Sequence, residues 1–116
     1  IEMVREAGAK KVLFASAAPP VKYQNLYGID MAATKELIAH NKTESEIAET
    51  IGADELIYQT LEDLISSVQE GNPEIKEFET SIFTGVYPTD IDDGYLQDLE
   101  ESRSDIIKMS EQKKAK

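Results

Sequence analysis

The stretch GAKKVLFASAAPP, from Gly8 to Pro20, decides the fold class of this 116-residue chain. A short, uninterrupted apolar run lies between a glycine and a pair of prolines, which is typical of a β-strand buried on both faces. Before it, the residues IEMVREA have apolar side chains at helical spacing, and Gly8 is placed to stop that helix. A helix end, a tight turn and a buried strand make half of a βαβ unit. We therefore predict an α/β fold with a parallel sheet and flanking helices.

The middle of the chain repeats this order of elements. Thr43 and Glu46 have the spacing of a capping box, which predicts a helix that Gly52 ends. The apolar run in DELIYQT predicts a second short strand, and Thr60 with Asp63 predicts another capping box at the start of a helix after it. The apolar residues that this helix is expected to bury are Leu61, Leu64, Ile65 and Val68.

Two further segments give weaker patterns. Residues 34–40 predict a short helix that buries Leu37 and Ile38, with Asn41 able to end it in the left-handed region. Residues 75–86 alternate imperfectly between apolar and polar, which predicts an edge or irregular extended segment with a turn at Thr84-Gly85.

From Asp92 onward the chain is expected to be helical, with a frayed end at EQKKAK. The apolar residues at near-helical spacing in this part are Tyr95, Leu96, Leu99, Ile106 and Ile107.

Composition and charge exclude several functional classes. Twelve basic and 23 acidic residues give a net charge of -11, which repels phosphate backbones, so neither nucleic acid nor an anionic membrane is an expected partner. The chain has no cysteine, which removes disulfides and thiolate sites. No apolar run is long enough to span a bilayer and no signal-peptide pattern is present, so we expect a cytoplasmic protein.

The chain offers few groups for catalysis. The acidic run TDIDD, residues 89–93, has two explanations, a metal loop or helix capping, and the helix dipole favours capping. His40 has no other histidine to form a metal site with, so we expect a structural or surface role. No Gly-rich phosphate loop, GxSxG or HExxH motif occurs. What remains are two loops at strand ends, ASAAPPVKY and YGID, since ligands of open α/β sheets bind beyond the carboxyl ends of strands. The small residues of the first loop would let a ligand approach, or they merely pack helix against strand.

The first helix has neither a capping residue nor an initiator methionine before it. Two or three predicted strands among four or five helices are also too few for a sheet that covers its helices. We therefore expect the chain to be a fragment whose sheet is completed by upstream residues or by a partner chain.

The run REAGAKKVLFASAAPPV, followed by YGIDM, ELIAH, EIAETIGAD, LIYQTLEDLI and FTGVYPT, resembles the carboxyl-terminal portion of the amidophosphoribosyltransferase family. The resemblance implies the end of a type I phosphoribosyltransferase domain in residues 1–70, and an extended segment with a C-terminal helical extension in residues 71–116. It implies an enzyme that makes phosphoribosylamine from phosphoribosyl pyrophosphate and glutamine, in the first step of purine synthesis. The fragment itself is expected not to be catalytic.

For the full-length enzyme the resemblance implies magnesium as a cofactor, purine nucleotides as inhibitors and a homo-oligomer. Family members with an iron–sulfur cluster have cysteines at three positions that here are Asn25, Glu79 and Ile82. Because these side chains cannot replace thiolates, we predict that no cluster is bound and that the chain is similar to the cluster-free branch.

Within the family the YGID turn faces the phosphoribosyltransferase centre on the side where ammonia arrives. The resemblance therefore implies that Tyr27 forms a wall of the ammonia route and that Asp30 gives polar support, with Pro19 and Pro20 shaping the adjacent loop. The structural alternative is that Tyr27 packs as a hydrophobic residue and Asp30 caps a helix. A competing hypothesis for the whole chain is an acidic α/β binding or assembly module without catalysis.

Overall fold

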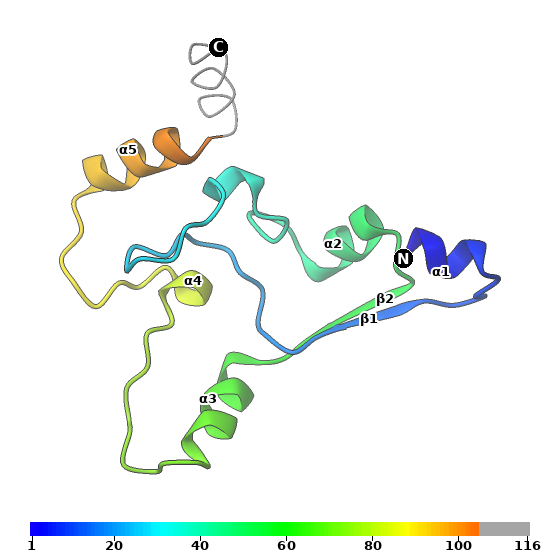
Figure 1. Ribbon diagram of the computed structural model, residues 1–116, viewed down its shortest axis with the longest axis horizontal. Coiled ribbons are helices and arrows are strands. Elements are labelled where there is room, and N and C mark those ends of the chain that lie inside the picture. Colours follow the sequence, from blue (N-terminus) through cyan, green and yellow to red (C-terminus); the bar gives the residue numbers. More distant parts are fainter. Residues whose placement is uncertain (105–116) are drawn as a thin grey trace. The chain divides into compact units, whose positions relative to one another are not determined.

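The computed structural model describes residues 1–104, with the elements shown in Figure 1. The described chain forms two compact units. The first, which we call the sheet unit, comprises Ile1–Pro20 and Asn41–Phe78. The second, the loop unit, comprises Val21–His40 and residues from Glu79 onward. The chain therefore leaves the sheet unit after Pro20 and returns to it at Asn41.

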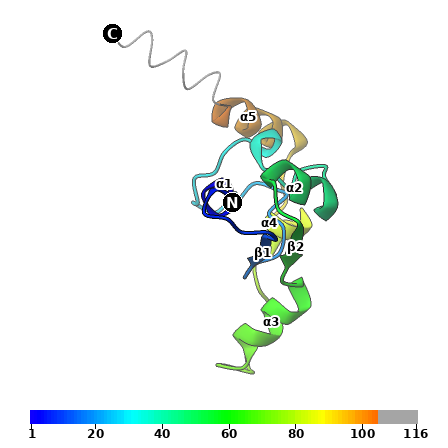
Figure 2. The same cartoon turned by 90° about the vertical axis from the view of Figure 1, so that its right-hand side faces the viewer.

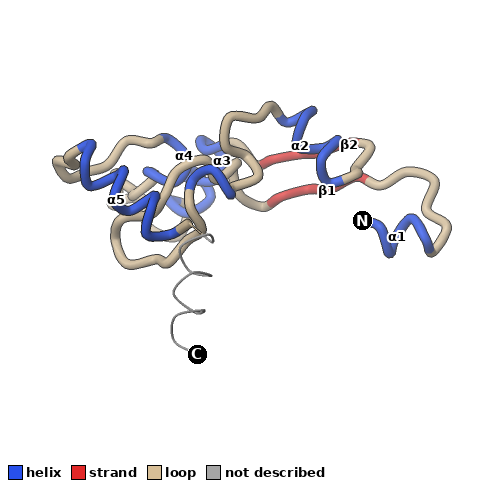
Figure 3. Tube along the Cα trace, turned by 90° about the horizontal axis from the view of Figure 1, so that it is seen from above, coloured by secondary structure: helices blue, strands red, loops and turns tan. Residues whose placement is uncertain are grey.

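The sheet unit is built on two parallel strands, which confirms the predicted α/β class. Strand β1, Leu13–Ser16, pairs with β2, Glu55–Tyr58, so that Leu13 lies opposite Glu55 and Ser16 opposite Tyr58. Figure 3 shows the two strands side by side in red. Both strands lie where the apolar runs of the sequence predicted them.

Two helices of the sheet unit confirm their predicted stop signals. Helix α1, Glu2–Glu6, is followed by Gly8 with a φ of 97°, in the left-handed region that favours glycine. Helix α2, Glu44–Ile51, packs against β2 (Figure 2) and ends at Gly52 with a φ of 74°. These glycines end each helix as the sequence indicated.

The predicted capping box at the start of α2 is also confirmed. The Thr43 Oγ1 atom accepts a hydrogen bond from the Glu46 backbone N–H at 3.3 Å, and the Glu46 carboxylate accepts one from the Thr43 N–H at 2.7 Å. The Thr43 bonds lower the pKa of Glu46 below its ordinary value of 4.5. At the next helix, α3, Leu61–Gln69, the predicted capping box is only half formed. The Thr60 Oγ1 accepts the Asp63 N–H at 3.1 Å, but the Asp63 carboxylate accepts from the Thr60 hydroxyl at 2.8 Å and not from its backbone N–H.

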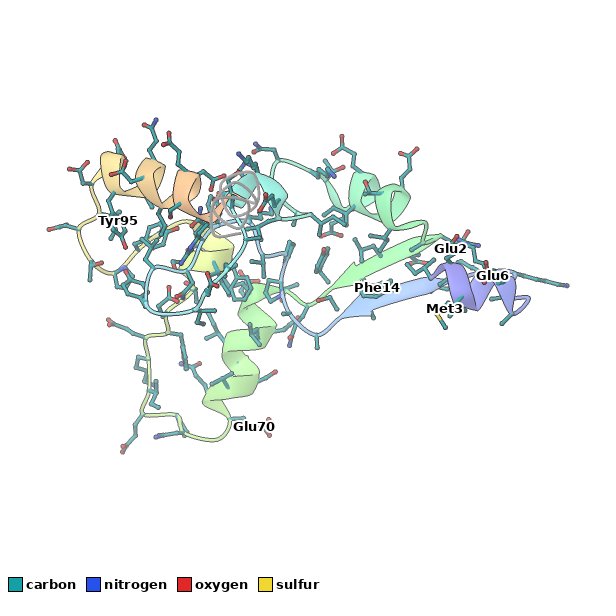
Figure 4. The ribbon with its side chains drawn as sticks, turned by 45° about the horizontal axis from the view of Figure 1, so that its top comes forward. Glu2, Met3, Glu6, Phe14, Glu70 and Tyr95 are labelled. Carbon is teal, nitrogen blue, oxygen red and sulfur yellow. The ribbon has the colours of Figure 1, made fainter. Side chains whose placement is uncertain are left out.

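The predicted burial of the strands and of α3 is partly wrong. Val12 and Leu56 are buried, but Leu13, Phe14 and Ile57 are 51%, 46% and 47% exposed; Figure 4 labels Phe14 on β1 and, on α1, Glu2, Met3 and Glu6. A strand is buried on both faces only when further strands and helices flank it, and two strands leave both edges open. On α3, Leu61, Leu64 and Ile65 are half-buried, whereas Val68 is 52% exposed because none of the described elements covers that side.

In the loop unit the predicted helix at residues 34–40 is largely wrong. Only Thr34–Glu36 form a single turn of 3-10 helix, η1, and Leu37 already has extended backbone angles. Leu37 is half-buried and Ile38 is 43% exposed, while Ala39 is 2% exposed. So short a helix is marginal by itself, so its tertiary contacts decide how far it extends. Asn41 does have the predicted left-handed backbone, with a φ of 53°.

The predicted extended segment at residues 75–86 is wrong over four residues. Ser81–Thr84 form a one-turn helix, α4, which ends at Gly85 with a φ of 73°. The bond between the Gly85 N–H and the Ser81 carbonyl, at 2.7 Å, closes this turn. The predicted turn at Thr84-Gly85 is therefore the helix end, and four residues are too few to give a helical periodicity that the sequence could reveal.

Helix α5, Asp93–Arg103, confirms the predicted C-terminal helix over its described part. The Asp92 carboxylate accepts the Gly94 N–H at 2.7 Å, so this member of the TDIDD run caps the helix. Tyr95 is 50% exposed, and Leu96 and Leu99 are half-buried. Ile106, Ile107 and the predicted frayed tail lie outside the described residues. None of the helices within residues 1–104 has both the length and the apolar character needed to cross a membrane.

Candidate functional site

The segment from Gln24 to Lys35, which we call the YGID loop, is organised by one buried side chain. Asn25 is 3% exposed, and its Oδ1 atom accepts hydrogen bonds from the backbone N–H groups of Tyr27 at 2.9 Å and Ile29 at 3.1 Å. An asparagine that binds the backbone two residues ahead forms an Asx turn. Gly28, with a φ of 103°, supplies the left-handed residue inside this turn. The turn that carries Tyr27 is therefore fixed from within.

Tyr27 forms one half of an aromatic pair. Its ring centroid lies 6.5 Å from that of Tyr87, with an angle of 59° between the planes. The Tyr27 hydroxyl is 3.0 Å from Thr89 Oγ1, and the Tyr87 hydroxyl donates to the Gln24 carbonyl at 2.9 Å. Burial, and to a smaller extent Glu79, raises the pKa of Tyr87 above 10, so the Tyr87 hydroxyl is neutral near pH 7. Since Tyr27 remains 41% exposed, the pair offers a partly exposed aromatic surface.

The other predicted site residues have different surroundings. Asp30 is exposed and makes no hydrogen bond with any other described residue, and Ala33 is the N-cap residue of η1, so Asp30 does not cap this helix. Pro19 is buried and Pro20 half-buried, both at the end of the first segment of the sheet unit. The structure thus brings Tyr27 and Asp30 into one loop, whereas the two prolines belong to the other unit.

The small residues before the prolines are tied into a turn. The Ser16 hydroxyl donates to the Ala18 carbonyl at 2.9 Å and lies 3.3 Å from the Ala18 N–H, from which it accepts. Ser16 therefore stabilises the turn that follows β1. Whether a ligand approaches these small residues stays a prediction.

Helix α5 supplies two charged residues that the sequence did not single out. Glu100 Oε2 accepts the Thr34 N–H at 2.6 Å, and Oε1 accepts the Lys35 N–H at 3.2 Å. Burial acts to raise the pKa of Glu100, but hydrogen bonds led by those from Thr34 and Lys35 outweigh it and hold that pKa below 4.5. Arg103 donates to the Gln24 side chain at 2.7 Å and to the Asn25 carbonyl at 3.0 Å. Both residues therefore hold the YGID loop through groups of its backbone and of Gln24.

The three positions discussed for a cluster lie close to the same loop. The Asn25 side-chain amide is 3.5 Å from the Glu79 carboxylate, and the Ile82 carbonyl accepts the N–H groups of Lys22 and Tyr23 at 2.9 and 3.1 Å. Glu79 also accepts the Ser81 N–H at 2.7 Å. The side chains at the three positions are thus an amide, a carboxylate and an alkyl group. In residues 1–104, no group of three or more histidine, aspartate or glutamate side chains is arranged to hold a metal ion.

A cavity of about 390 Å³ lies within the loop unit, and its lining includes Tyr23, Tyr87, Leu96 and Glu100. The volume falls within the range of small-ligand pockets, which begins at about 300 Å³. Its carboxylate is already bonded to the backbone of η1, and its apolar walls come from α5 and the tyrosines. This cavity is thus largely apolar, with its main charge engaged by the protein.

Comparison with known proteins relates the chain to one enzyme family. No protein-family model matches it. The amidophosphoribosyltransferase of Pasteurella multocida is 53% identical over 116 residues, which are 99% of this chain and 23% of that protein. The enzyme of Escherichia coli is 56% identical over 109 residues, 93% of this chain and 22% of that protein. The Saccharomyces cerevisiae enzyme is 50% identical over 115 residues, 99% of this chain and 22% of that protein. The match therefore covers nearly the whole of this chain, but less than a quarter of the length of each of these amidophosphoribosyltransferases.

Proposed function

We propose that this chain is one part of an amidophosphoribosyltransferase, the enzyme that makes phosphoribosylamine from phosphoribosyl pyrophosphate and glutamine at the start of purine synthesis. The observation that carries the proposal is the identity of 50–56% that the chain shares with three such enzymes from two bacteria and a yeast. Similarity at this level extends across both the sheet unit and the loop unit. We assign the activity to the full-length protein, because the chain spans only 22–23% of the length of the enzymes it matches.

In this proposal the YGID loop lines the phosphoribosyltransferase centre where ammonia arrives. Tyr27 forms part of the wall, and Asp30 gives polar support from the exposed side of the loop. The tilted pair of Tyr27 and Tyr87 supports this role, since two aromatic rings side by side make an apolar wall that excludes water. Pro19 and Pro20 stiffen the loop after β1, where proline fixes the backbone angle φ.

The full-length enzyme would use phosphoribosyl pyrophosphate and glutamine as substrates and purine nucleotides as inhibitors, and it would act as a cytoplasmic homo-oligomer. Magnesium would bind together with the pyrophosphate substrate. Within residues 1–104, no group of three or more histidine, aspartate or glutamate side chains is arranged to hold a metal ion. In this proposal the metal is held by residues outside this segment.

The enzyme would carry no iron–sulfur cluster. The support is chemical: the chain has no cysteine, and Asn25 and Glu79 use their side chains to hold backbone N–H groups of the loop and of α4. Cluster iron is held by thiolates, which these residues cannot supply. Iron and sulfide analysis of the purified full-length protein is expected to find neither, and stoichiometric iron with sulfide would contradict this part of the proposal.

The role of Tyr27 can be tested in the full-length enzyme. Tyr27→Ala removes the exposed ring, so we expect glutaminase activity to continue while more glutamate is released per phosphoribosylamine formed. Tyr27→Phe keeps the ring and loses only the contact with Thr89, so its ratio is expected to stay near that of the wild type. Tyr95→Ala is the matched control, because Tyr95 is also about half exposed and lies outside the YGID loop. A ratio in Tyr27→Ala equal to that in Tyr95→Ala would sink the assignment of Tyr27.

A further inference from the structure

Helix α5 holds the YGID loop at both of its ends. Near the far end, the two oxygens of Glu100 accept the backbone N–H groups of Thr34 and Lys35, the first residues of η1. Near the start, Arg103 donates to the Asn25 carbonyl at 3.0 Å and, at 3.4 Å, to the Ile29 carbonyl. The two charged residues lie one helical turn apart on α5, so they face the loop together. Figure 1 shows α5, in orange, in the same part of the molecule as the cyan segment that carries η1.

Gln24 connects the two charged residues to each other. Its side-chain amide nitrogen donates to Glu100, and its side-chain oxygen accepts from Arg103 at 2.7 Å. The residue is 3% exposed, and its backbone carbonyl accepts the hydroxyl of Tyr87. A buried amide with both ends bonded to charged groups has one orientation, since reversing it would set donor against donor and acceptor against acceptor. Glu100, Gln24 and Arg103 therefore form one connected unit.

The position of Tyr27 depends on this connected unit. Asn25 fixes the Tyr27 N–H with its side chain, and the carbonyl of the same Asn25 is held by Arg103. Tyr87, which pairs with the Tyr27 ring, is held by the Gln24 carbonyl. Bonds to charged groups are stronger than those between neutral groups, so they can fix a loop that has no strand partner.

We infer that Glu100 and Arg103 are positioning residues that hold the YGID loop, and with it the pair of Tyr27 and Tyr87, in the conformation that couples ammonia release to ammonia use. The inference rests on the proposed function for the reaction that is coupled. Neither residue needs to touch a substrate. Each acts on the loop backbone or on Gln24, from a helix at the other end of the chain.

The test uses the full-length enzyme with the substitutions Glu100→Gln and Arg103→Met. Glu100→Gln keeps the shape of the side chain but loses the charge and one acceptor oxygen. Arg103→Met keeps an unbranched side chain and loses all its donors. Glu101→Gln is the matched control, because Glu101 is the next residue on α5 and its side chain is exposed. The measurements are the glutamate released per phosphoribosylamine, the activity with ammonia in place of glutamine, and hydrogen exchange of a peptide covering residues 24–35.

We expect exchange in this peptide to become about tenfold faster in Glu100→Gln and Arg103→Met, the scale that follows from losing a hydrogen bond to a charged group. Uncoupled glutamate release is expected to increase as well, while glutaminase activity and the exchange of peptides in the sheet unit stay as in Glu101→Gln. The effect of the double variant is expected to be smaller than the sum of the two single effects, because Glu100 and Arg103 share Gln24 as a partner. A residue with a merely structural role would lower the glutaminase activity and the activity with ammonia together.

Failure of the inference and failure of the proposed function are distinguishable. Unchanged hydrogen exchange in residues 24–35 of the variants contradicts the positioning role, whatever the measured enzyme activities are. Faster exchange with an unchanged glutamate ratio contradicts the link from the loop to coupling. A wild-type enzyme that forms no phosphoribosylamine from either nitrogen source contradicts the proposed function, and the exchange data then decide whether α5 holds the loop.

Discussion

Arg5 and Asp54 form an ion pair with a distance of 2.8 Å, which joins α1 to the residue that precedes β2. The same guanidinium donates to the Gly52 carbonyl at 3.1 and 2.7 Å, at the end of α2. The same carboxylate accepts the Val12 N–H at 2.7 Å, just before β1. Two side chains thus fasten the ends of two helices to the starts of both strands.

Replacing Asp54 with asparagine is expected to lower the stability of the sheet unit. The Val12 N–H, followed by the Arg5 guanidinium, holds the pKa of Asp54 below its ordinary value of 3.8. A carboxyl group whose pKa is lower in the folded state contributes stability at pH values above 3.8, and this contribution is lost as the pH falls through the folded pKa. The difference in melting temperature between wild type and Asp54→Asn should therefore be full near neutral pH and shrink in acid.

Thermal unfolding of the full-length protein between about pH 2 and pH 7 measures this difference. Glu55→Gln is the control, because the neighbouring pair of Lys11 and Glu55 is longer, at 3.3 Å, and more exposed. Exposed pairs of this kind contribute little. A melting difference for Asp54→Asn that stayed constant down to the lowest pH would show that the charge of Asp54 does not stabilise the fold.

The two glycines that end α2 and α4 differ in their surroundings. Gly52 and Gly85 have nearly the same φ, 74° and 73°, but a Cβ atom at Gly85 would lie 2.9 Å from the Tyr23 ring, whereas at Gly52 the nearest atom is 3.9 Å away. Gly52→Ala should therefore cost about 1–2 kcal/mol for the left-handed backbone alone. Gly85→Ala should cost about 1–3 kcal/mol more for the overlap with the ring.

Denaturant unfolding of the full-length protein gives these costs. Tyr23→Ala removes the ring that a Cβ atom at Gly85 would meet. In this Tyr23→Ala background, the cost of Gly85→Ala should fall to that of Gly52→Ala. Equal costs for Gly52→Ala and Gly85→Ala in the wild-type background would mean that the Tyr23 ring moves aside freely.

The exposed apolar residues of the sheet make a prediction for the isolated 116-residue chain. Leu13, Phe14 and Ile57 are about half exposed, and both strand edges are open in the described residues. An isolated sheet of this kind is expected to bind an apolar dye and to unfold gradually with heat, without a response to AMP or GMP. The competing hypothesis of an independent binding module predicts one sharp, cooperative transition and measurable affinity for a protein partner or a nucleotide.

The sequence could predict the features of this fold that depend on near neighbours. Thr43 and Glu46, three residues apart, gave the cap of α2, and the apolar runs gave both strands and their parallel pairing. The burial of Leu13 and Phe14 could not be predicted in the same way, because it depends on what flanks the sheet.

The candidate site was less predictable for a related reason. The Asx turn at Asn25 has a local signal, an asparagine two residues before Tyr27, but the resemblance marks Asn25 only as a position where cluster-bearing members have cysteine. Glu100 and Arg103 have no such signal, since their partners lie 65 to 79 residues away in the sequence. A charged pair on an exposed helix has the same pattern whether it faces water or holds a loop.

The proposed function is tested most directly by one measurement on the full-length protein. Purified enzyme is mixed with phosphoribosyl pyrophosphate, magnesium and glutamine, and phosphoribosylamine and glutamate are quantified together. The similarity of the chain to amidophosphoribosyltransferases predicts that the two products appear in nearly equal amounts, and only when phosphoribosyl pyrophosphate is present. Glutamate without phosphoribosylamine, or neither product, would contradict it.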